Sequence, residues 1–155
     1  DFHNFSDSQL ESILATNFTA PFRIAREAIK PMLSQGSGSI VNMGSISGFV
    51  ANKPQLQVAY NSSKAAIHQM TTTMAFEYAS RGIRVNALAP GYIISDMTAG
   101  GIENAEWNKI WTENTPMQRF GKPSEMANCA LFLASDAASY VNGATLVADG
   151  GYLTH

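Results

Sequence analysis

Apolar residues recur at helical spacing along three stretches of the chain. One stretch covers residues 58–80, contains neither glycine nor proline, and would make about six helical turns. Another covers residues 6–33 and opens on a serine that can cap free backbone N–H groups. Pro21 and Pro31 are expected to bend or interrupt this second helix, because proline donates no backbone hydrogen bond. The third stretch covers residues 123–134, whose C-A-L-F-L run is expected in the core.

Between these helices lie three short β-branched or apolar runs, each ending at glycine or proline. They are residues 38–48, in which a strand opens into a tight turn, residues 83–91, and residues 144–151. Strands joined by helix-length connections indicate an α/β fold with a doubly wound parallel sheet that helices cover on both faces. Ligands bind such sheets beyond the carboxyl ends of the strands, which is where Ser45 and Pro90–Gly91 are expected.

Tyr60 and Lys64 are four residues apart on the predicted helix 58–80, so they share one face of it. A tyrosine titrates near pH ~10, and a nearby cation favours the phenolate that a proton acceptor needs. By itself, the pair is weak evidence for catalysis, and a structural tyrosine beside a solvated lysine is the better interpretation of it. His68 lies one further turn along the same helix. Histidine is the usual candidate for a general base near neutral pH.

Four segments decide between these interpretations when they are taken together. They are N-M-G-S-I-S-G, A-Y-N-S-S-K with its tyrosine fifteen residues after Ser45, R-V-N-A-L-A-P-G-Y, and V-N-G-A-T-L-V-A-D-G-G. Their order and spacing resemble the short-chain dehydrogenase/reductase family through nearly the whole chain, which implies a Rossmann-like fold. Within that family the chain is most similar to polyol dehydrogenases and ketose reductases such as galactitol dehydrogenase. These share an N-x-P-Q segment, here residues 52–55, and T-P-M-x-R, here residues 115–119.

The resemblance implies catalytic roles for Asn17, Ser45, Tyr60 and Lys64. Tyr60 is then the proton acceptor, in place of His68. Ser45 binds the substrate oxygen, and Lys64 lowers the tyrosine pKa and holds the ribose hydroxyls of the cofactor. The backbone carbonyl of Asn17 is expected to hold a water beside the lysine. From its residue type alone, Asn17 equally fits a polar position on a solvated helix face.

The resemblance also implies a nicotinamide cofactor, NAD or NADP. Its expected contacts are Tyr60, Lys64, Pro90, Gly91, Ile93 and Ser95. Ile93 would offer backbone hydrogen bonds to the carboxamide, and Ser95 stands where a threonine is common. Gly91 would leave room for the cofactor ring, although Pro90–Gly91 can also simply end the strand. Residues 97–118 are expected to form a mobile lid whose two tryptophans pack against the core.

Composition narrows the setting in which this chemistry occurs. The net charge of −2 and the pI near 5.9 argue against nucleic-acid or membrane-surface binding. The single cysteine, Cys129, indicates a reducing compartment, hence a cytoplasmic protein, and is expected to be a buried thiol. The histidines show no metal-ligand spacing, so no catalytic metal is predicted. Charged residues make up 14%, against about 25% on average, which favours buried subunit interfaces, and the resemblance implies a homotetramer.

A glycine-rich loop for the cofactor pyrophosphate does not occur in these residues, and the residue that separates NAD from NADP is expected outside them. We therefore expect residues 1–155 to be the carboxyl-terminal part of a single Rossmann-like domain. The predicted function of the complete subunit is hydride transfer between a nicotinamide cofactor and a secondary alcohol or ketone, of the polyol/ketose class. The alternatives are a 3-oxoacyl-thioester reductase of the same family and a catalytically inactive fragment that serves as an assembly module.

Overall fold

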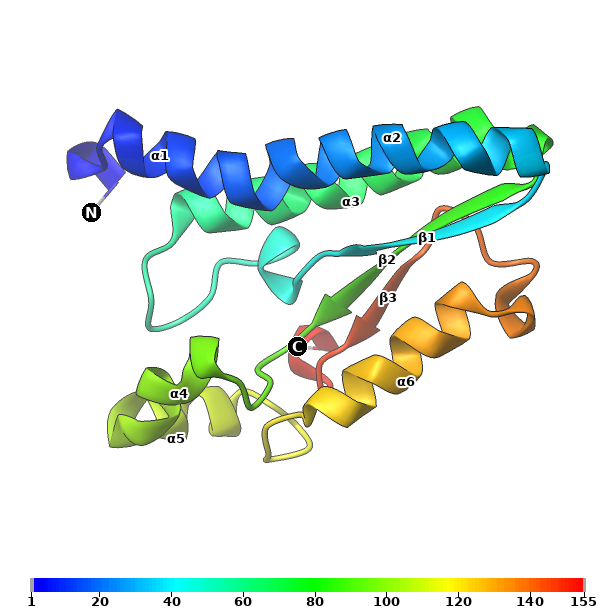
Figure 1. Cartoon of the computed structure of the whole chain (residues 1–155). Helices are drawn as coiled ribbons and strands as arrows, with labels where there is room; N and C mark the ends of the chain where they lie inside the picture. Colours follow the sequence, from blue (N-terminus) through cyan, green and yellow to red (C-terminus); the bar gives the residue numbers. More distant parts are fainter. Residues whose placement is uncertain (1, 155) are drawn as a thin grey trace.

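A parallel sheet lies between two layers of helices in the computed structural model, which describes residues 2–154 (Figure 1). Its strands are β1 (Gly38–Met43), β2 (Ile83–Pro90) and β3 (Thr145–Ala148), in the order β1-β2-β3. The helices are α1 (Asp7–Leu14), α2 (Ala20–Gln35), α3 (Val58–Tyr78), α4 (Asp96–Glu103), α5 (Ala105–Glu113) and α6 (Pro123–Ala134). The predicted α/β class is confirmed, because every strand pair is parallel.

The helices cover the sheet on both faces. Figure 1 shows α2 and α3 along one face and α6 on the other, while α4 and α5 lie beyond the carboxyl end of β2. The register pairs Gly38 with Ile83 and Ala87 with Thr145, so the carboxyl ends of the three strands gather at one edge. The segment after β1 and the segment after β2 therefore meet at that edge, where α/β sheets bind their ligands.

The core is centred on β2, the middle strand. Its residues from Ile83 to Ala89 are buried apart from Arg84, as expected for a strand with neighbours on both sides and helices on both faces. On one face Ile29 of α2 and Ala75 of α3 pack against Ile83 and Val85. Each fully buried Ile or Leu contributes about 1.5–3 kcal/mol, so this packing holds α3 firmly on the sheet.

The long amino-terminal helix is interrupted, but not at the expected residues. Ser6 caps α1 as predicted, accepting the Gln9 N–H at 3.3 Å. The interruption is a π-helical turn at Ala15–Thr19, one turn before the expected break at Pro21, and Pro31 lies inside α2 without ending it. Pro21 has no N–H to give to a carbonyl four residues earlier, and a turn widened to i→i+5 bonding accommodates this loss.

Helix α6 has the predicted bounds, but the expectation that its C-A-L-F-L run is core was wrong. Leu133 is buried, whereas Leu131 is 67% exposed and Phe132 is 40% exposed. The reason is geometric: α6 presents one face to the sheet, and residues one or two positions from Leu133 point to other sides of the helix. Cys129 is half-buried rather than buried.

Candidate active site

Ser45 lies where β1 ends and the chain turns. It precedes a short 3₁₀ turn at Ile46–Gly48, and its hydroxyl accepts the Ser47 N–H at 3.1 Å. Ser45 is buried, and its side chain lies close enough to the Tyr60 hydroxyl on α3 to lower the Tyr60 pKa. The structure therefore brings together the serine and the tyrosine that the sequence motifs placed fifteen residues apart.

Lys64 follows Tyr60 by one turn of α3, as predicted. Its Nζ lies 5.6 Å from the centre of the Tyr60 ring and donates a hydrogen bond to the Met43 carbonyl at 3.0 Å. The ammonium group therefore lies over the ring and is tied to the last residue of β1. Ser45, Tyr60 and Lys64 form one cluster at the carboxyl end of that strand.

The protonation of this cluster differs from the expectation. Burial raises the pKa of Tyr60 above its ordinary value, and the hydrogen bond from Ser45 opposes that rise. Burial also lowers the pKa of Lys64. The predicted lowering of the Tyr60 pKa is thus not seen in this structure, because desolvation of the phenolate outweighs the favourable contact. A phenol held neutral in this way is arranged to donate its proton to a substrate oxygen.

Asn17 lies in the π-helical turn and reaches α3 with its side chain. Its Nδ2 donates to Ser63 Oγ at 3.0 Å, and Ser63 Oγ donates in turn to the Tyr60 carbonyl at 2.7 Å. Ser63 is fully buried, so this chain of two hydrogen bonds anchors the first turn of α3 to the interrupted helix. The role of the Asn17 backbone carbonyl remains a prediction. The bracing role of Ser63 could have been suspected only from its place three residues after Tyr60.

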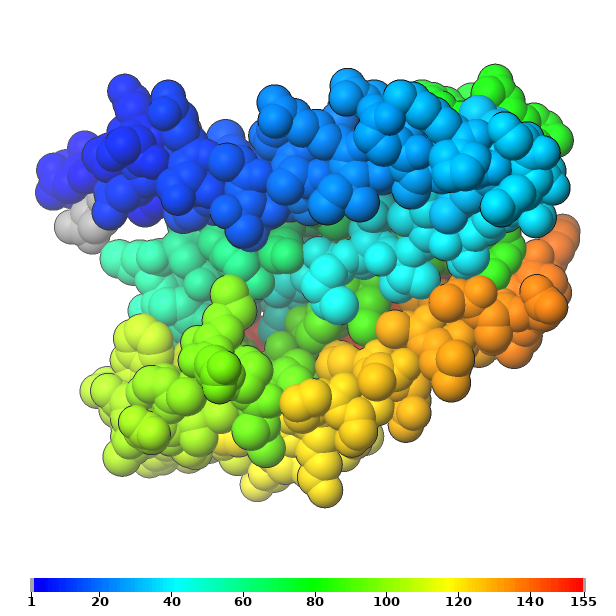
Figure 2. All heavy atoms as spheres, viewed as in Figure 1, coloured from blue at the N-terminus to red at the C-terminus, as the bar shows by residue number. Residues whose placement is uncertain are grey.

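A cavity of about 280 Å³ opens in front of Ser45 and Tyr60. Figure 2 shows the surface hollowed between the cyan turn after β1 and the green α4. The cavity is lined by Ser45, Ile46, Ser47, Asn52, Gln55, Gln57, Tyr60, Gly91, Tyr92, Met97, Thr98, Trp107 and Trp111. The lining combines aromatic rings with amides and hydroxyls, which suits a small polar ligand.

Three of the lining residues form a polar network that sequence reasoning missed. Trp111 is 4% exposed, and its indole N–H donates to Gln55 Oε1 at 3.2 Å, while Gln55 Nε2 donates to the Tyr92 hydroxyl at 3.0 Å. The Tyr92 and Trp111 rings stack with centres 4.3 Å apart. Gln55 belongs to the N-x-P-Q segment, which was noticed as a motif but was given no role. The expected packing of the Trp111 indole is confirmed, and it also forms a wall of the cavity.

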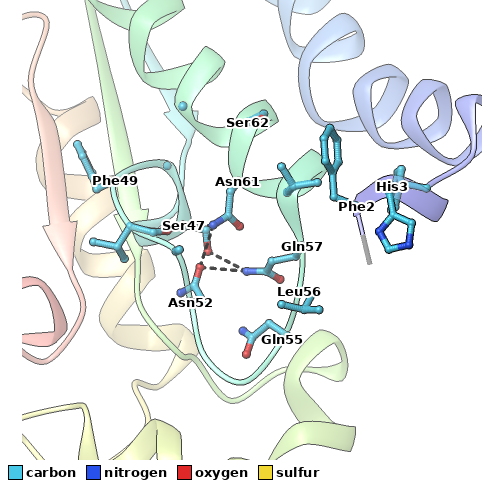
Figure 3. Close-up of a pocket in the computed structure, with 16 residues that line it drawn as sticks. Phe2, His3, Ser47, Phe49, Asn52, Gln55, Leu56, Gln57, Asn61 and Ser62 are labelled. Atoms are coloured by element: carbon cyan, nitrogen blue, oxygen red, sulfur yellow. Dashed lines mark hydrogen bonds between the residues drawn. The ribbon is translucent and has the colours of Figure 1, made fainter.

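The loop before α3 carries the other amides. Figure 3 shows Gln57 pointing toward Asn52 and Ser47, to which its Nε2 donates at 3.0 Å and 3.3 Å. These bonds tie the loop to the turn after Ser45. The same loop also lines an open groove of about 770 Å³, and Phe2 near the amino terminus lines the groove as well.

The residues assigned to the nicotinamide are only partly brought to this cavity. Pro90 ends β2 and Gly91 lines the cavity. A Cβ at Gly91 would lie 2.8 Å from the Asp149 Cα, so glycine is needed there for the close approach of the segments after β2 and β3. This requirement is separate from the expected room for a cofactor ring.

Ile93 and Ser95 lie outside the lining of that cavity. Ile93 pairs with Gly121 in an isolated parallel bridge, and its carbonyl accepts the Thr98 hydroxyl. Ser95 is the residue before α4, and its N–H donates to Thr98 Oγ1 at 3.1 Å. The structure thus gives both residues a structural part at the start of α4, and their contacts with a cofactor remain predictions.

Within residues 2–154, no three His, Cys, Asp or Glu side chains are grouped so that they could hold a metal ion. Among the helices of that part of the chain, none combines the length and apolar character that crossing a membrane requires.

Comparison with known proteins gives concordant matches. Residues 1–153 match the family model described as enoyl-(acyl carrier protein) reductase. The chain is 49% identical over 146 residues to galactitol 2-dehydrogenase (L-tagatose-forming) of Cereibacter sphaeroides, covering 94% of this chain and 58% of that protein. It is 40% identical to a 3-oxoacyl-acyl-carrier-protein reductase of Rickettsia felis, covering 95% and 59%.

A solved structure shares the fold closely. The gluconate 5-dehydrogenase of Burkholderia cenocepacia, solved in complex with NADP and tartrate, superposes with a TM-score of 0.95 at 30% identity. The superposition covers 99% of this chain and 60% of that one. The chain thus spans somewhat more than half the length of each protein that it matches here.

Proposed function

The chain belongs to the short-chain dehydrogenase/reductase family, and on that premise we propose that the complete subunit is an NAD(P)-dependent oxidoreductase acting on a secondary alcohol or ketone. The observation that carries the proposal is that Ser45 and Tyr60 meet at one wall of the cavity, with Lys64 over the tyrosine ring. This arrangement supplies a proton donor and a second hydrogen-bond donor for one substrate oxygen.

Each residue of the cluster has a definite task in this chemistry. A bound nicotinamide takes or gives the hydride. Tyr60 gives its proton to the carbonyl oxygen in reduction and takes the hydroxyl proton in oxidation. Ser45 donates a hydrogen bond to the same oxygen and so stabilises the charge that develops there. The positive charge of Lys64 stabilises the buried phenolate of Tyr60. Asn17 holds the first turn of α3 in place through its hydrogen bond to Ser63.

The described residues fit the nicotinamide end of a dinucleotide site. Ser45 and Gly91 follow the carboxyl ends of adjacent parallel strands, which is the usual position for such a cofactor. The Lys64 ammonium, which lies over the ring of the cavity residue Tyr60, would hold the ribose hydroxyls. Contacts with the carboxamide through Ile93 and Ser95 are part of the proposal, and either NAD or NADP is compatible with these residues.

A polyol/ketose pair is the substrate class that the cavity favours. A volume of about 280 Å³ with three amide side chains, two phenols and two serines in its lining suits a short polyhydroxylated chain. The galactitol and gluconate dehydrogenases among the relatives support this class. A 3-oxoacyl-thioester reductase is the alternative, which the Rickettsia felis relative favours. An inactive assembly module is the other alternative.

Steady-state kinetics of the full-length protein distinguish these candidates. We expect galactitol or D-arabinitol to be oxidised with NAD or NADP at a kcat/KM at least about 10-fold above that for reduction of an acetoacetyl thioester. The reverse preference would identify the thioester reductase. Absence of turnover together with absence of nicotinamide fluorescence quenching would identify the inactive module. Ser45→Ala provides the control: it should lower kcat at least about 100-fold, and turnover at the wild-type rate would arise from a contaminating enzyme.

We further propose that the subunits form a homotetramer in the cytoplasm. Two separate exposed apolar surfaces support the assembly. The first joins α2 and α3, where Ile24 is exposed and Phe76 is 87% exposed, and the second joins α6 and β3 through Leu131 and Val147. Light scattering of the full-length protein at micromolar concentration should give the mass of four subunits. A monomer would contradict the proposal, and Leu131→Asp should reduce the assembly to dimers if the second surface is an interface.

A further inference from the structure

Three polar side chains along one stripe of α3 bind the carboxyl end of β1 and the turn that follows it. The stripe has the spacing i, i+4, i+7, so its members lie on one face of the helix. The bonds join Lys64 Nζ to the Met43 carbonyl at 3.0 Å, His68 Nε2 to the Ser45 N–H at 3.4 Å, and Thr71 Oγ1 to Asn42 Nδ2 at 2.9 Å. The stripe fixes the helix that carries Tyr60 against the segment that carries Ser45.

The His68 ring occupies the centre of this contact. A Cβ at Gly44 would lie 2.3 Å from His68 Nε2, and a Cβ at Gly48 would lie 2.5 Å from Cε1. The ring therefore fills the space that both glycines of the turn leave open. Phe49 stacks on its other side, with ring centres 4.4 Å apart. The turn around Ser45 thus packs directly against the imidazole ring of His68.

The hydrogen bonding of His68 shows that more than its volume is used. Because Nε2 accepts the Ser45 N–H, the neutral ring carries its proton on Nδ1. Nδ1 is buried and has no hydrogen-bond partner within residues 2–154. Burial, and then the charge of Lys64, lower the pKa of His68, which keeps the ring neutral. A buried N–H without a partner destabilises the fold, and a hydrocarbon ring would fill the same space without that cost. The hydrogen bond that Nε2 accepts from Ser45 offsets the cost of the unpaired Nδ1–H.

We propose that His68 is a positioning residue for the reaction: its Nε2 holds the Ser45 backbone and thereby directs the Ser45 hydroxyl at Tyr60 and the substrate oxygen. The inference rests on the proposed function, because it assigns His68 to the orientation of a group in that reaction. A small displacement of Ser45 would weaken its effect on Tyr60 and the hydrogen bond that its hydroxyl donates to the substrate. Displacements of about 1 Å at such groups reduce rates by up to about 100-fold.

Two substitutions in the full-length protein separate the acceptor from the volume of the ring. His68→Phe keeps an aromatic ring against Phe49 and removes the acceptor, whereas the amide oxygen of His68→Gln can reach the Nε2 position. For His68→Phe we expect kcat for alcohol oxidation to fall at least about 10-fold with KM nearly unchanged. The apparent kinetic pKa should rise, because the bond from Ser45 lowers the Tyr60 pKa. His68→Gln should recover most of kcat and the original pH profile.

Thr72→Val is the matched control, since Thr72 is exposed and, within residues 2–154, its hydroxyl bonds only the His68 carbonyl of the same helix. Wild-type kcat and pH profile in His68→Phe would overturn the inference. So would equal losses in both His68 variants with an unmoved pH profile, which would indicate packing alone. A wild-type protein without alcohol dehydrogenase activity would overturn the proposed function instead. Imidazole ¹⁵N spectra independently test the hydrogen bond from the Ser45 N–H to His68 Nε2. A proton on Nδ1 would support this bond, and a proton on Nε2 would contradict it.

Discussion

Tyr60→Phe in the full-length protein should lower kcat for alcohol oxidation and ketone reduction by at least about 100-fold, the usual contribution of a positioned acid or base. The substitution removes one hydroxyl group and keeps the ring over which the Lys64 ammonium lies. Cofactor affinity should therefore change by less than about two-fold, which a fluorescence titration with reduced nicotinamide cofactor measures.

Tyr78→Phe is a suitable control for this loss. Tyr78 is the last residue of the same helix, where its ring packs beside Arg81, away from the cavity. It should leave both kcat and cofactor affinity unchanged. Turnover above a few per cent in Tyr60→Phe would remove Tyr60 as the proton donor and acceptor. Parallel loss of turnover and cofactor binding would mean that the phenol holds the cofactor instead.

Lys64→Met should combine two losses. The ammonium lies 5.6 Å from the Tyr60 ring centre, and a positive charge at that position favours the phenolate that oxidation needs. Removing the charge should raise the kinetic pKa of alcohol oxidation by about 1–2 at an effective dielectric near 20. Oxidation needs the phenolate, so it should slow most at neutral pH and recover partly as the pH rises. Cofactor affinity should fall as well, because the ribose hydroxyls lose their donor.

The pH profile of kcat and a cofactor titration together test this account. Lys30→Met is the control, since that lysine is exposed on α2 and pairs with Glu27. It should leave the profile in place. A Lys64→Met profile that coincides with the wild type would refute the electrostatic role. An unchanged cofactor affinity would refute the contact with the ribose.

The sheet and the central part of the site could be predicted because their signals are local. Glycine and proline end the strands, and helical spacing puts Tyr60 and Lys64 on one face, so both features follow from short-range rules. The rule that ligand sites form at the carboxyl ends of parallel strands placed Ser45 at the site, and the family resemblance implied its meeting with Tyr60. These features needed no knowledge of how side chains pack.

The features that were missed depend on packing between distant segments. The fit of the His68 ring against Gly44 and Gly48 exists only once α3 lies across the turn. The exposure of Leu131 on α6 depends on which face of an apolar helix meets the sheet, and the composition of that helix does not reveal the face. The direction of the Tyr60 pKa depends on burial, which an i,i+4 spacing alone does not report.

The π-helical turn at Ala15–Thr19 sets the tolerance of this region to changes in length. Such a turn is equivalent to one residue inserted into an α-helix, and each helical residue rotates the chain by about 100°. Losing one residue there would restore regular bonding and would turn α1 by about that angle relative to α2. Asn17 would then face away from Ser63, and the first turn of α3 would lose its brace. Point substitutions can accumulate along this helix, whereas its residue count is constrained by a contact 46 positions away.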